Sequence, residues 1–340
     1  MKKVTIKDVA REAGVSVTLV SFVMNAKMGK DGRLDCPVNP DTAARVLKVA
    51  KKLGYRKNAA AASLRSGKSN TIAVITTDIS NKFFAGVSRY IEDKAFSYGY
   101  NVLFSSSDED PARLDAVMDT VLAYNIDGVI VAPVSGGINA INKAVDSKVP
   151  VVLLDRDIEG LSGVGKVLLD DVKAGEMATK LLVDNGYTNI EMISYSLGIS
   201  SLSEREQGYK KVMNENKLTA NIHYTTYANA QEDIEGFITD ALEKGVEALF
   251  LPTYSLCAKA LLVMKNRGLK TPDDLAVVGF DISDIYTLFN NTVTHIIQPL
   301  KELGEKSVEV LRNLIEDTEG DTTIILNPIL IDGESTARKK

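Results

Sequence analysis

The sequence predicts an α/β protein with a helix-turn-helix head at its amino end, followed by a core of two doubly wound parallel-sheet lobes. Residues 4–55 place apolar side chains at helical spacing, which indicates the helical head. From Thr71 onward, short apolar runs alternate with amphipathic helices, which is typical of a parallel sheet covered on both faces. The alternation occurs twice in tandem, so we expect two lobes with a cleft between them.

Residues 4–25 are predicted to form two short helices joined by a tight turn. Thr5 caps the first helix, and Asp8 supplies the other half of a capping box. Gly14 ends that helix and Ser16 caps the next. The second helix carries small, hydroxylated and apolar groups on its outer face and is expected to enter the major groove of DNA.

The charge distribution supports DNA binding over the alternative of an ordinary helical hairpin in a globular core. Residues 1–68 hold 15 Lys or Arg against 5 Asp or Glu, a net charge of +10. The other residues, 69–340, have a net charge of −15. A basic head on an acidic protein is the expected electrostatic footprint of a DNA-binding domain.

Composition excludes several classes of protein. Cys36 and Cys257 cannot form a disulfide framework, and no metal-ligand spacing occurs. His223 and His295 have no triad context and there is no phosphate loop, so an enzyme is not expected and neither is a cofactor. No signal peptide or membrane span is predicted, which favours a cytoplasmic protein.

The elements follow in order along the chain. A third head helix begins at Asn39 and Pro40 and ends at Gly54, a loop fills 26–38, and a two-turn helix of marginal stability covers 58–65. Strands are expected at 72–76, 102–106, 128–131, 151–154, 190–194, 222–226, 248–251 and 276–279. Helices are expected near 84–98, 111–124, 137–147, 173–185, 204–216, 231–244 and 256–267. A helix near 300–317 and a final strand at 324–331 should cross back to complete the first lobe.

These motifs together resemble the lac repressor family, whose core is similar to type I periplasmic binding proteins. The resemblance covers nearly the whole chain and is carried by Thr5-Ile-Lys-Asp-Val-Ala, Ala13-Gly-Val-Ser, Leu53-Gly-Tyr, Ser63-Leu-Arg, Asp78-Ile-Ser-Asn-Lys-Phe-Phe, Gly128-Val-Ile-Val, Pro150-Val-Val-Leu-Leu-Asp, Val278-Gly-Phe-Asp and Gln298-Pro-Leu. It implies a DNA-binding domain at 1–57, a hinge helix and linker at 58–70, an N-lobe at 71–168 plus 299–332, a C-lobe at 169–298 and a tail at 333–340.

The resemblance also implies a ligand-responsive regulator, by family default a repressor, with activation left open. Such proteins are homodimers or tetramers on pseudo-palindromic double-stranded operators. Leu64 takes the role of the hinge leucine that wedges between base pairs in the minor groove, which agrees with the physics of apolar wedges. The DNA-binding residues that it implies are Thr5, Ser16, Val17, Thr18, Ser21, Phe22, Asn25, Tyr55, Asn58, Ala61, Leu64 and Arg65.

The head departs from the family pattern at three places. Phe22 stands where the family usually has Arg, and Phe cannot donate bidentate hydrogen bonds to guanine, so base preference should shift toward thymine methyl or shape contacts. Ala62 stands where the hinge normally carries Arg. The segment 26–38 is longer than usual, and its Lys27, Lys30 and Arg33 either contact phosphates or only solubilise a loop.

The resemblance places an effector pocket between the lobes. Its expected residues are Asp78, Phe83, Phe84, Asp155, Arg156, Arg205, Tyr254, Asp281 and Gln298. Carboxylates and arginines beside aromatic rings suit a small carbohydrate. Taken alone, Asp155, Arg156 or Asp281 fits an interlobe salt bridge equally well. Tyr254 lies where relatives typically have a carboxylate, so a purine or a phosphorylated sugar stays open as the ligand.

Two other functions compete with this one. An enzyme would need a catalytic constellation that the sequence does not supply. A transport-type sugar-binding protein would share the core, but the basic helical head and the lack of a predicted signal peptide argue against it.

Overall fold

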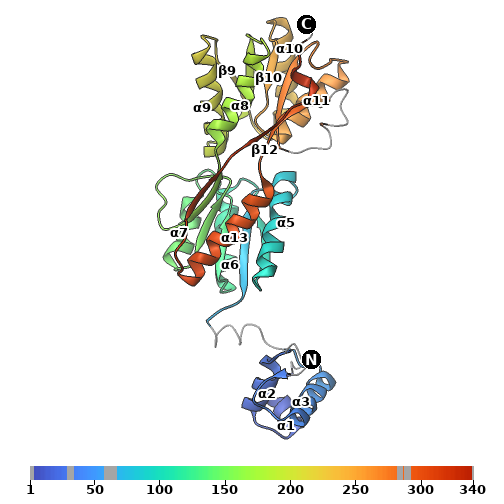
Figure 1. Cartoon of the computed structure of the whole chain (residues 1–340), viewed down its shortest axis with the longest axis vertical. Coiled ribbons are helices and arrows are strands. Elements are labelled where there is room, and N and C mark those ends of the chain that lie inside the picture. Colours follow the sequence, from blue (N-terminus) through green and yellow to red (C-terminus); the bar gives the residue numbers. More distant parts are fainter. Residues whose placement is uncertain (1–3, 29–33, 57–66, 282–285, 287–291, 339–340) are drawn as a thin grey trace. The chain divides into compact units, whose positions relative to one another are not determined.

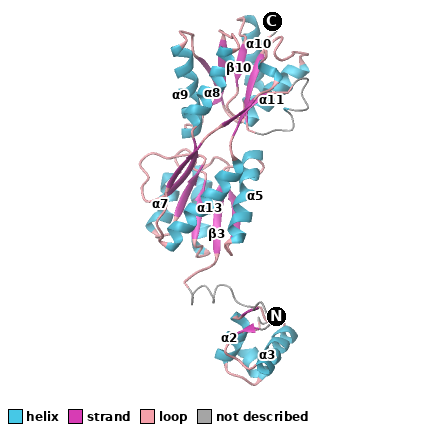
Figure 2. Cartoon of the chain, in the orientation of Figure 1, coloured by secondary structure: helices cyan, strands magenta, loops and turns pink. Residues whose placement is uncertain are grey.

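The computed structural model of the chain describes residues 4–28, 34–56, 67–281, 286 and 292–338. The chain divides into two compact units, Met1–Ser69 and Asn70–Lys340 (Figures 1 and 2). Within the described residues, no helix combines the length and the apolar character that a membrane crossing requires.

The first unit is a bundle of three helices: α1 (Ile6–Ala13), α2 (Val17–Asn25) and α3 (Pro40–Leu53). Gly14 and Gly54 end α1 and α3 in the left-handed conformation, with φ of 65° and 66°. Ser16 Oγ accepts the Leu19 N–H at 3.2 Å and so caps α2. The three predicted head helices and the caps of α2 and α3 are confirmed, and Val9, Val20 and Val46 form the fully buried centre of the bundle.

The predicted loop at 26–38 is wrong in one respect. The chain forms a short antiparallel pair, β1 (Lys27–Met28) with β2 (Leu34–Asp35). Leu34, Cys36 and Val38 pack partly buried against the helical core, so this part of the segment adds to the apolar core of the head. The predicted hinge helix at 58–65 lies outside the described residues.

The second unit contains two six-stranded sheets with the same strand connectivity. The N-lobe sheet has the order β13-β7-β6-β5-β3-β4 and the C-lobe sheet the order β14-β12-β11-β10-β8-β9. All N-lobe pairs are parallel, and in the C-lobe only β14 is antiparallel. The predicted doubly wound, two-lobed core is therefore confirmed.

Helices cover both faces of each sheet. In the N-lobe, α5 and α13 bury one face and α6 and α7 the other. In the C-lobe, α8 and α9 bury one face and α10 and α11 the other. Figure 1 shows α13, near the end of the chain, beside α5, so distant segments share one core. The N-lobe elements are β3 (Thr71–Thr76), α5 (Lys82–Ser97), β4 (Asn101–Ser106), α6 (Pro111–Ala123), β5 (Gly128–Val131), α7 (Ile138–Asp146), β6 (Val151–Leu154), β7 (Gly165–Leu169), α13 (Leu300–Glu316) and β13 (Thr323–Leu326).

The C-lobe elements are α8 (Asp171–Asp184), β8 (Ile190–Tyr195), α9 (Ser200–Glu215), β9 (Asn221–Thr225), α10 (Ala230–Glu243), β10 (Ala248–Phe250), α11 (Tyr254–Asn266), β11 (Ala276–Phe280), β12 (Thr294–Ile297), β14 (Ile329–Ile331) and the 3₁₀ turn η1 (Glu334–Thr336). Every predicted helix and strand of the core up to residue 317 has a counterpart. The sequence analysis missed β7 and β12, the two short strands that precede crossings between the lobes.

The predicted single strand at 324–331 is wrong. Two strands occupy this stretch, with β13 in the N-lobe sheet and β14 in the C-lobe sheet. Pro328 separates them, since a proline has no N–H to donate to a ladder. The chain thus crosses between the lobes a third time, after crossings near Asp170 and Gln298.

Residues 334–336, within the predicted tail, pack onto the C-lobe. Ser335 is fully buried, and its Oγ donates to the Val277 carbonyl at 2.6 Å and accepts the Thr294 N–H at 2.8 Å. The third crossing is therefore anchored on its C-lobe side.

Candidate effector pocket and DNA-binding surface

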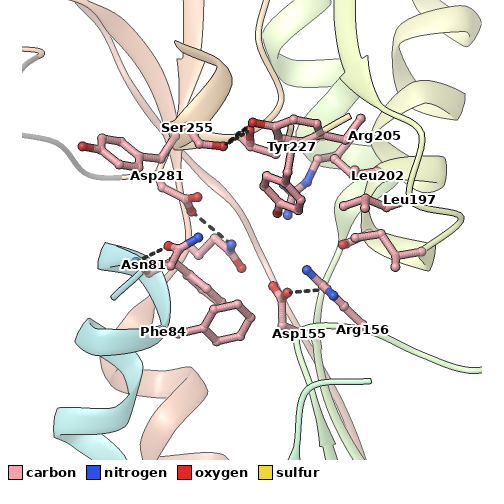
Figure 3. Close-up of a pocket in the computed structure, with 17 residues that line it drawn as sticks. Asn81, Phe84, Asp155, Arg156, Leu197, Leu202, Arg205, Tyr227, Ser255 and Asp281 are labelled. Carbon is pink, nitrogen blue, oxygen red and sulfur yellow. Dashed lines mark hydrogen bonds and ion pairs between the residues drawn. The ribbon is translucent and has the colours of Figure 1, made fainter. Parts of the chain in front are cut away.

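A pocket lies between the two lobes of the core (Figure 3). Asn81, the N-cap of α5, and Phe84 of α5 line it from the N-lobe, and Arg205 of α9 lines it from the C-lobe. Other lining residues follow the carboxyl ends of the strands, where open α/β sheets bind ligands.

Asp155 and Asp281 occupy equivalent places in the two lobes. Asp155 follows β6 and donates its N–H to Val167 O at 3.0 Å, and Asp281 follows β11 and donates its N–H to Ile296 O at 2.8 Å. Both have left-handed backbones, with φ of 70° and 62°, which aspartate tolerates better than most residues. The repeated turn brings one carboxyl group from each lobe to the pocket (Figure 3).

Arg205 is held by three partners within the C-lobe. Its Nε donates to Asp171 Oδ1 at 2.7 Å, and its Nη1 donates to the Pro252 carbonyl at 2.7 Å. Its Cζ lies 3.7 Å from the centre of the Phe280 ring. The side chains of Arg205 and Asp171 are 5% and 2% exposed, so the pair is desolvated and its geometry is fixed.

Arg156 has its own carboxylate partner in the N-lobe. Its two terminal nitrogens donate to the two carboxylate oxygens of Glu109, at 2.9 and 2.8 Å. Its Nη1 also donates to Pro133 O at 3.1 Å. Such a bidentate pair fixes the plane of the guanidinium group.

Three buried polar atoms at the pocket have no hydrogen-bond partner among the described residues: Asp155 Oδ1, Arg156 Nε and Gln298 Oε1. Arg156 Nε lies 3.5 Å from Asp155 Oδ2, an ion-pair distance. Gln298 uses its Nε2 to donate to Asp281 Oδ1 at 3.1 Å. Buried polar atoms without partners are costly, and a polar ligand that paired them would recover that cost.

Burial dominates the acid–base behaviour of the two aspartates. It raises the pKa of Asp281 to about 6, against the opposing effects of Arg205, of the Gln298 hydrogen bond and of the Tyr254 N–H. Burial also raises the pKa of Asp155, although Arg156 and Arg205 act in the opposite direction. Ionised carboxylates in this pocket are thus under-solvated and suited to accept hydrogen bonds.

Aromatic rings frame the pocket on both sides. Phe84 lies on the N-lobe side, with Arg156 Cζ 6.0 Å from the centre of its ring. Tyr195 and Tyr227 lie on the C-lobe side, with ring centres 4.3 Å apart, and the Tyr195 hydroxyl is 2.9 Å from Ser255 Oγ. The pocket therefore combines flat apolar faces with hydrogen-bonding groups.

The head presents a mixed surface on α2. Val17 is 41% exposed and Phe22 is 48% exposed, whereas Val20 and Val23 are buried in the bundle. The remaining residues predicted on this face, Ser16, Thr18, Ser21 and Asn25, are exposed or half-buried, and Asn25 Nδ2 donates to Ser21 Oγ at 3.1 Å.

Two further predicted DNA contacts lie elsewhere in the head. Thr5 donates its N–H and hydroxyl to Asp8 Oδ2 at 3.0 and 2.7 Å, and Tyr55 packs partly buried on the helical core. The other predicted DNA contacts, Asn58, Ala61, Leu64 and Arg65, lie outside the described residues.

Comparison with known proteins accounts for both units. Residues 5–58 match the family described as "Bacterial regulatory proteins, lacI family", and residues 72–319 match "Periplasmic binding protein domain". Catabolite control protein A of Priestia megaterium is 32% identical over 337 residues, which cover 97% of this chain and 98% of the relative. The chain belongs to the lacI family of bacterial regulatory proteins.

Two more comparisons agree with this membership. The HTH-type transcriptional repressor PurR of Vibrio campbellii is 29% identical over 325 residues, covering 94% of each chain. The crystal structure of the lac repressor dimer bound to operator and the anti-inducer ONPF covers 99% of this chain and 100% of its own at 22% identity, with a TM-score of 0.83, and shows the same fold. This lacI-family chain is a DNA-binding transcriptional regulator with a ligand-binding core, and not an enzyme.

The structure brings most of the predicted pocket residues of this lacI-family chain together. Those that line the pocket are Phe83, Phe84, Asp155, Arg156, Arg205, Tyr254, Asp281 and Gln298. Asp78 is not among the lining residues. It is exposed, and its Oδ1 accepts the N–H and the hydroxyl of Ser80 at 2.8 and 2.7 Å, so it stabilises the turn before α5.

The sequence analysis missed other lining residues, namely Asn81, Tyr195, Leu197, Ile199, Ser201, Leu202, Tyr227, Thr253 and Ser255. Tyr195 ends β8, and Tyr227 comes shortly after β9. The rule that ligands bind at the carboxyl ends of parallel strands could have found both tyrosines. The sequence around Glu109 and Asp171 contains no motif that would predict their pairing with the two arginines.

Replacement of Asp281 by Asn tests the burial of its carboxyl group. The folded-state pKa near 6 lies above the ordinary value, so the ionised group costs stability at pH 7.5. As the pH falls through 6, the folded protein takes up this proton before the unfolded chain does, and the wild type gains stability. We therefore expect the free energy of unfolding of the wild type to rise relative to Asp281→Asn between pH 7.5 and 5.

Urea unfolding of the ligand-free protein at both pH values measures this difference. Leu182→Ala, which removes a fully buried side chain and no ionisable group, is the control and should follow the pH trend of the wild type. A difference in unfolding free energy between the wild type and Asp281→Asn that does not change with pH would contradict a buried Asp281 carboxyl group with a raised pKa.

Proposed function

We propose that this lacI-family regulator is a repressor that binds a pseudo-palindromic operator as a homodimer and responds to a small neutral carbohydrate held between its lobes. Its place of action is then the compartment that holds the DNA, the cytoplasm. The observation that carries the choice of effector is the pairing of charges at the pocket.

Each arginine at the pocket already has a buried or partly buried carboxylate partner. Arg156 is paired with Glu109, and Arg205 is paired with Asp171. Asp155, whose Oδ2 lies 3.5 Å from Arg156 Nε, and Asp281 are two further carboxyl groups, so carboxyl groups outnumber guanidinium groups around the pocket. A phosphorylated sugar would bring further negative charge to these aspartates, and like charges in a desolvated site repel.

A neutral polyol fits this arrangement better. Its hydroxyl groups would donate to Asp155 Oδ1 and Gln298 Oε1, which have no hydrogen-bond partner in the described part of the chain, and accept from Arg156 Nε. Its apolar ring face packs on an aromatic ring such as Phe84 or Tyr227. Sugars offer both kinds of surface in one small molecule.

The exposed face of α2 supports direct contact with base edges in a major groove. Val17 and Phe22 supply apolar surface suited to thymine methyl groups. The basic charge of residues 1–68 supplies the non-specific attraction to phosphates. Two copies of the head would read the two halves of an inverted repeat.

Selection from a random DNA pool tests the operator proposal. We expect an inverted repeat, and we expect Phe22→Arg to move one position in each half-site toward guanine, because Arg donates to guanine O6 and N7. A good bidentate pair is worth about 1–3 kcal/mol of discrimination. Phe96→Arg, at an 80% exposed phenylalanine of the core, is the matched control and should leave the selected sequence unchanged. A single asymmetric half-site would contradict the proposal.

A ligand panel tests the effector proposal. Isothermal calorimetry with the full chain should find binding among neutral monosaccharides and none among their phosphate esters. Asp155→Asn should weaken the bound sugar about tenfold to hundredfold, because a hydrogen bond to a charged group is worth about 1.5–3 kcal/mol. Asp146→Asn, at an exposed carboxylate of α7 outside the pocket lining, is the control and should bind normally. Tighter binding of sugar phosphates or of purine bases than of neutral sugars would contradict the choice of effector.

A further inference from the structure

The helices α8 and α9 meet at two glycines that lie outside the pocket lining. An ideal Cβ on Gly175 of α8 would overlap the carbonyl oxygen of Arg205 and lie 2.9 Å from its carbonyl carbon and 3.0 Å from its Cα. The backbone of α8 is therefore in direct contact with the backbone of the residue that carries the pocket guanidinium.

The second glycine makes the reciprocal contact. An ideal Cβ on Gly208 of α9 would overlap the carbonyl oxygen of Val172 and lie 2.6 Å from the Glu176 nitrogen. Val172 directly follows Asp171, the carboxylate that binds Arg205. Gly175 thus lies against the backbone of Arg205. Gly208 lies against the backbone of Val172, the residue next to Asp171.

A glycine inside a helix is unfavourable by roughly 1 kcal/mol relative to alanine, so each position needs a compensating reason. Gly236 in α10 provides the contrast, because a Cβ there would have nothing within 4 Å. At Gly175 and Gly208 the atoms that a Cβ would meet are backbone atoms, which cannot rotate away as a flexible side chain can.

We propose that Gly175 and Gly208 are positioning residues for Arg205. They let α8 and α9 approach to the separation at which Arg205 Nε reaches Asp171 Oδ1 and Nη1 reaches Pro252 O, both at 2.7 Å. A binding site must hold its groups within about 0.5 Å of their working positions, and a methyl group between two helix backbones exceeds that tolerance. The part of this inference that rests on the proposed function is the assignment of Arg205 to effector binding.

The consequence is that effector recognition depends on a helix contact outside the pocket. The two lobes hold their arginines differently. Arg156 is held by two hydrogen bonds to Glu109, whereas the position of Arg205 depends on the spacing of α8 and α9. A substitution at either glycine is expected to change the position of Arg205 without replacing any residue that lines the pocket.

The Nε–H of Arg205 reports this position directly and requires no effector. In nuclear magnetic resonance spectra of the full chain labelled with ¹⁵N-arginine, this signal is assigned by its loss in Arg205→Lys. We expect Gly175→Ala and Gly208→Ala to shift the signal and to speed exchange of its proton with water at least tenfold. Gly236→Ala, a helical glycine of the same lobe with open space around it, should leave the signal unchanged.

A second control separates positioning from general loss of stability. Leu182→Ala removes a fully buried side chain of α8 and should lower the thermal midpoint of the lobe while leaving the Arg205 signal in place. An unchanged signal in both glycine variants, or an equal shift in Leu182→Ala, would overturn the proposal. Loss of folding in both glycine variants would also overturn it, because the glycines would then serve lobe assembly. The result is independent of whether any sugar binds.

Discussion

The buried charges at the boundary of the two lobes are the constraint on which the rest of the core depends. Charged groups are costly to remove from water unless they are paired, and here each arginine has a dedicated carboxylate from its own lobe. Asp155 shares Arg156 with Glu109 at 3.5 Å, and Asp281 accepts a hydrogen bond from the neutral Gln298 amide. The protein therefore carries an incomplete hydrogen-bond network between its lobes, and a small polar molecule is the natural partner to complete it.

The topology links this network to the crossings between the two lobes of the core. The chain crosses between the lobes three times, and Gln298 lies on one crossing while its side chain binds Asp281. Direct interlobe contacts also exist, such as the Asp157 N–H donated to Ser200 Oγ at 2.8 Å. A ligand that contacts both lobes changes their preferred arrangement only to the extent that it binds one arrangement more tightly than another.

The sequence predicted the parts of the fold that are encoded locally. Alternating apolar runs gave the strands, and caps such as Ser16 and Asn39 gave the ends of head helices. Long-range partners were not predictable in this way, because Glu109 and Arg156 are 47 positions apart and no periodicity links them. Of the effector residues that the resemblance implied, all but Asp78 line the pocket, and Asp78 Oδ1 accepts hydrogen bonds in the turn before α5. The break at Pro328 could have been read from the missing N–H of proline, and the third crossing followed from it.

The most direct test of a ligand-gated regulator is calorimetry on the two states of the protein. A neutral monosaccharide found in the ligand panel is titrated into the free protein and into the protein saturated with its selected operator. A typical coupling of about 1–3 kcal/mol predicts affinities that differ about 5- to 150-fold, and operator affinity must change by the same factor when the sugar saturates. Equal sugar affinity with and without operator would contradict this account.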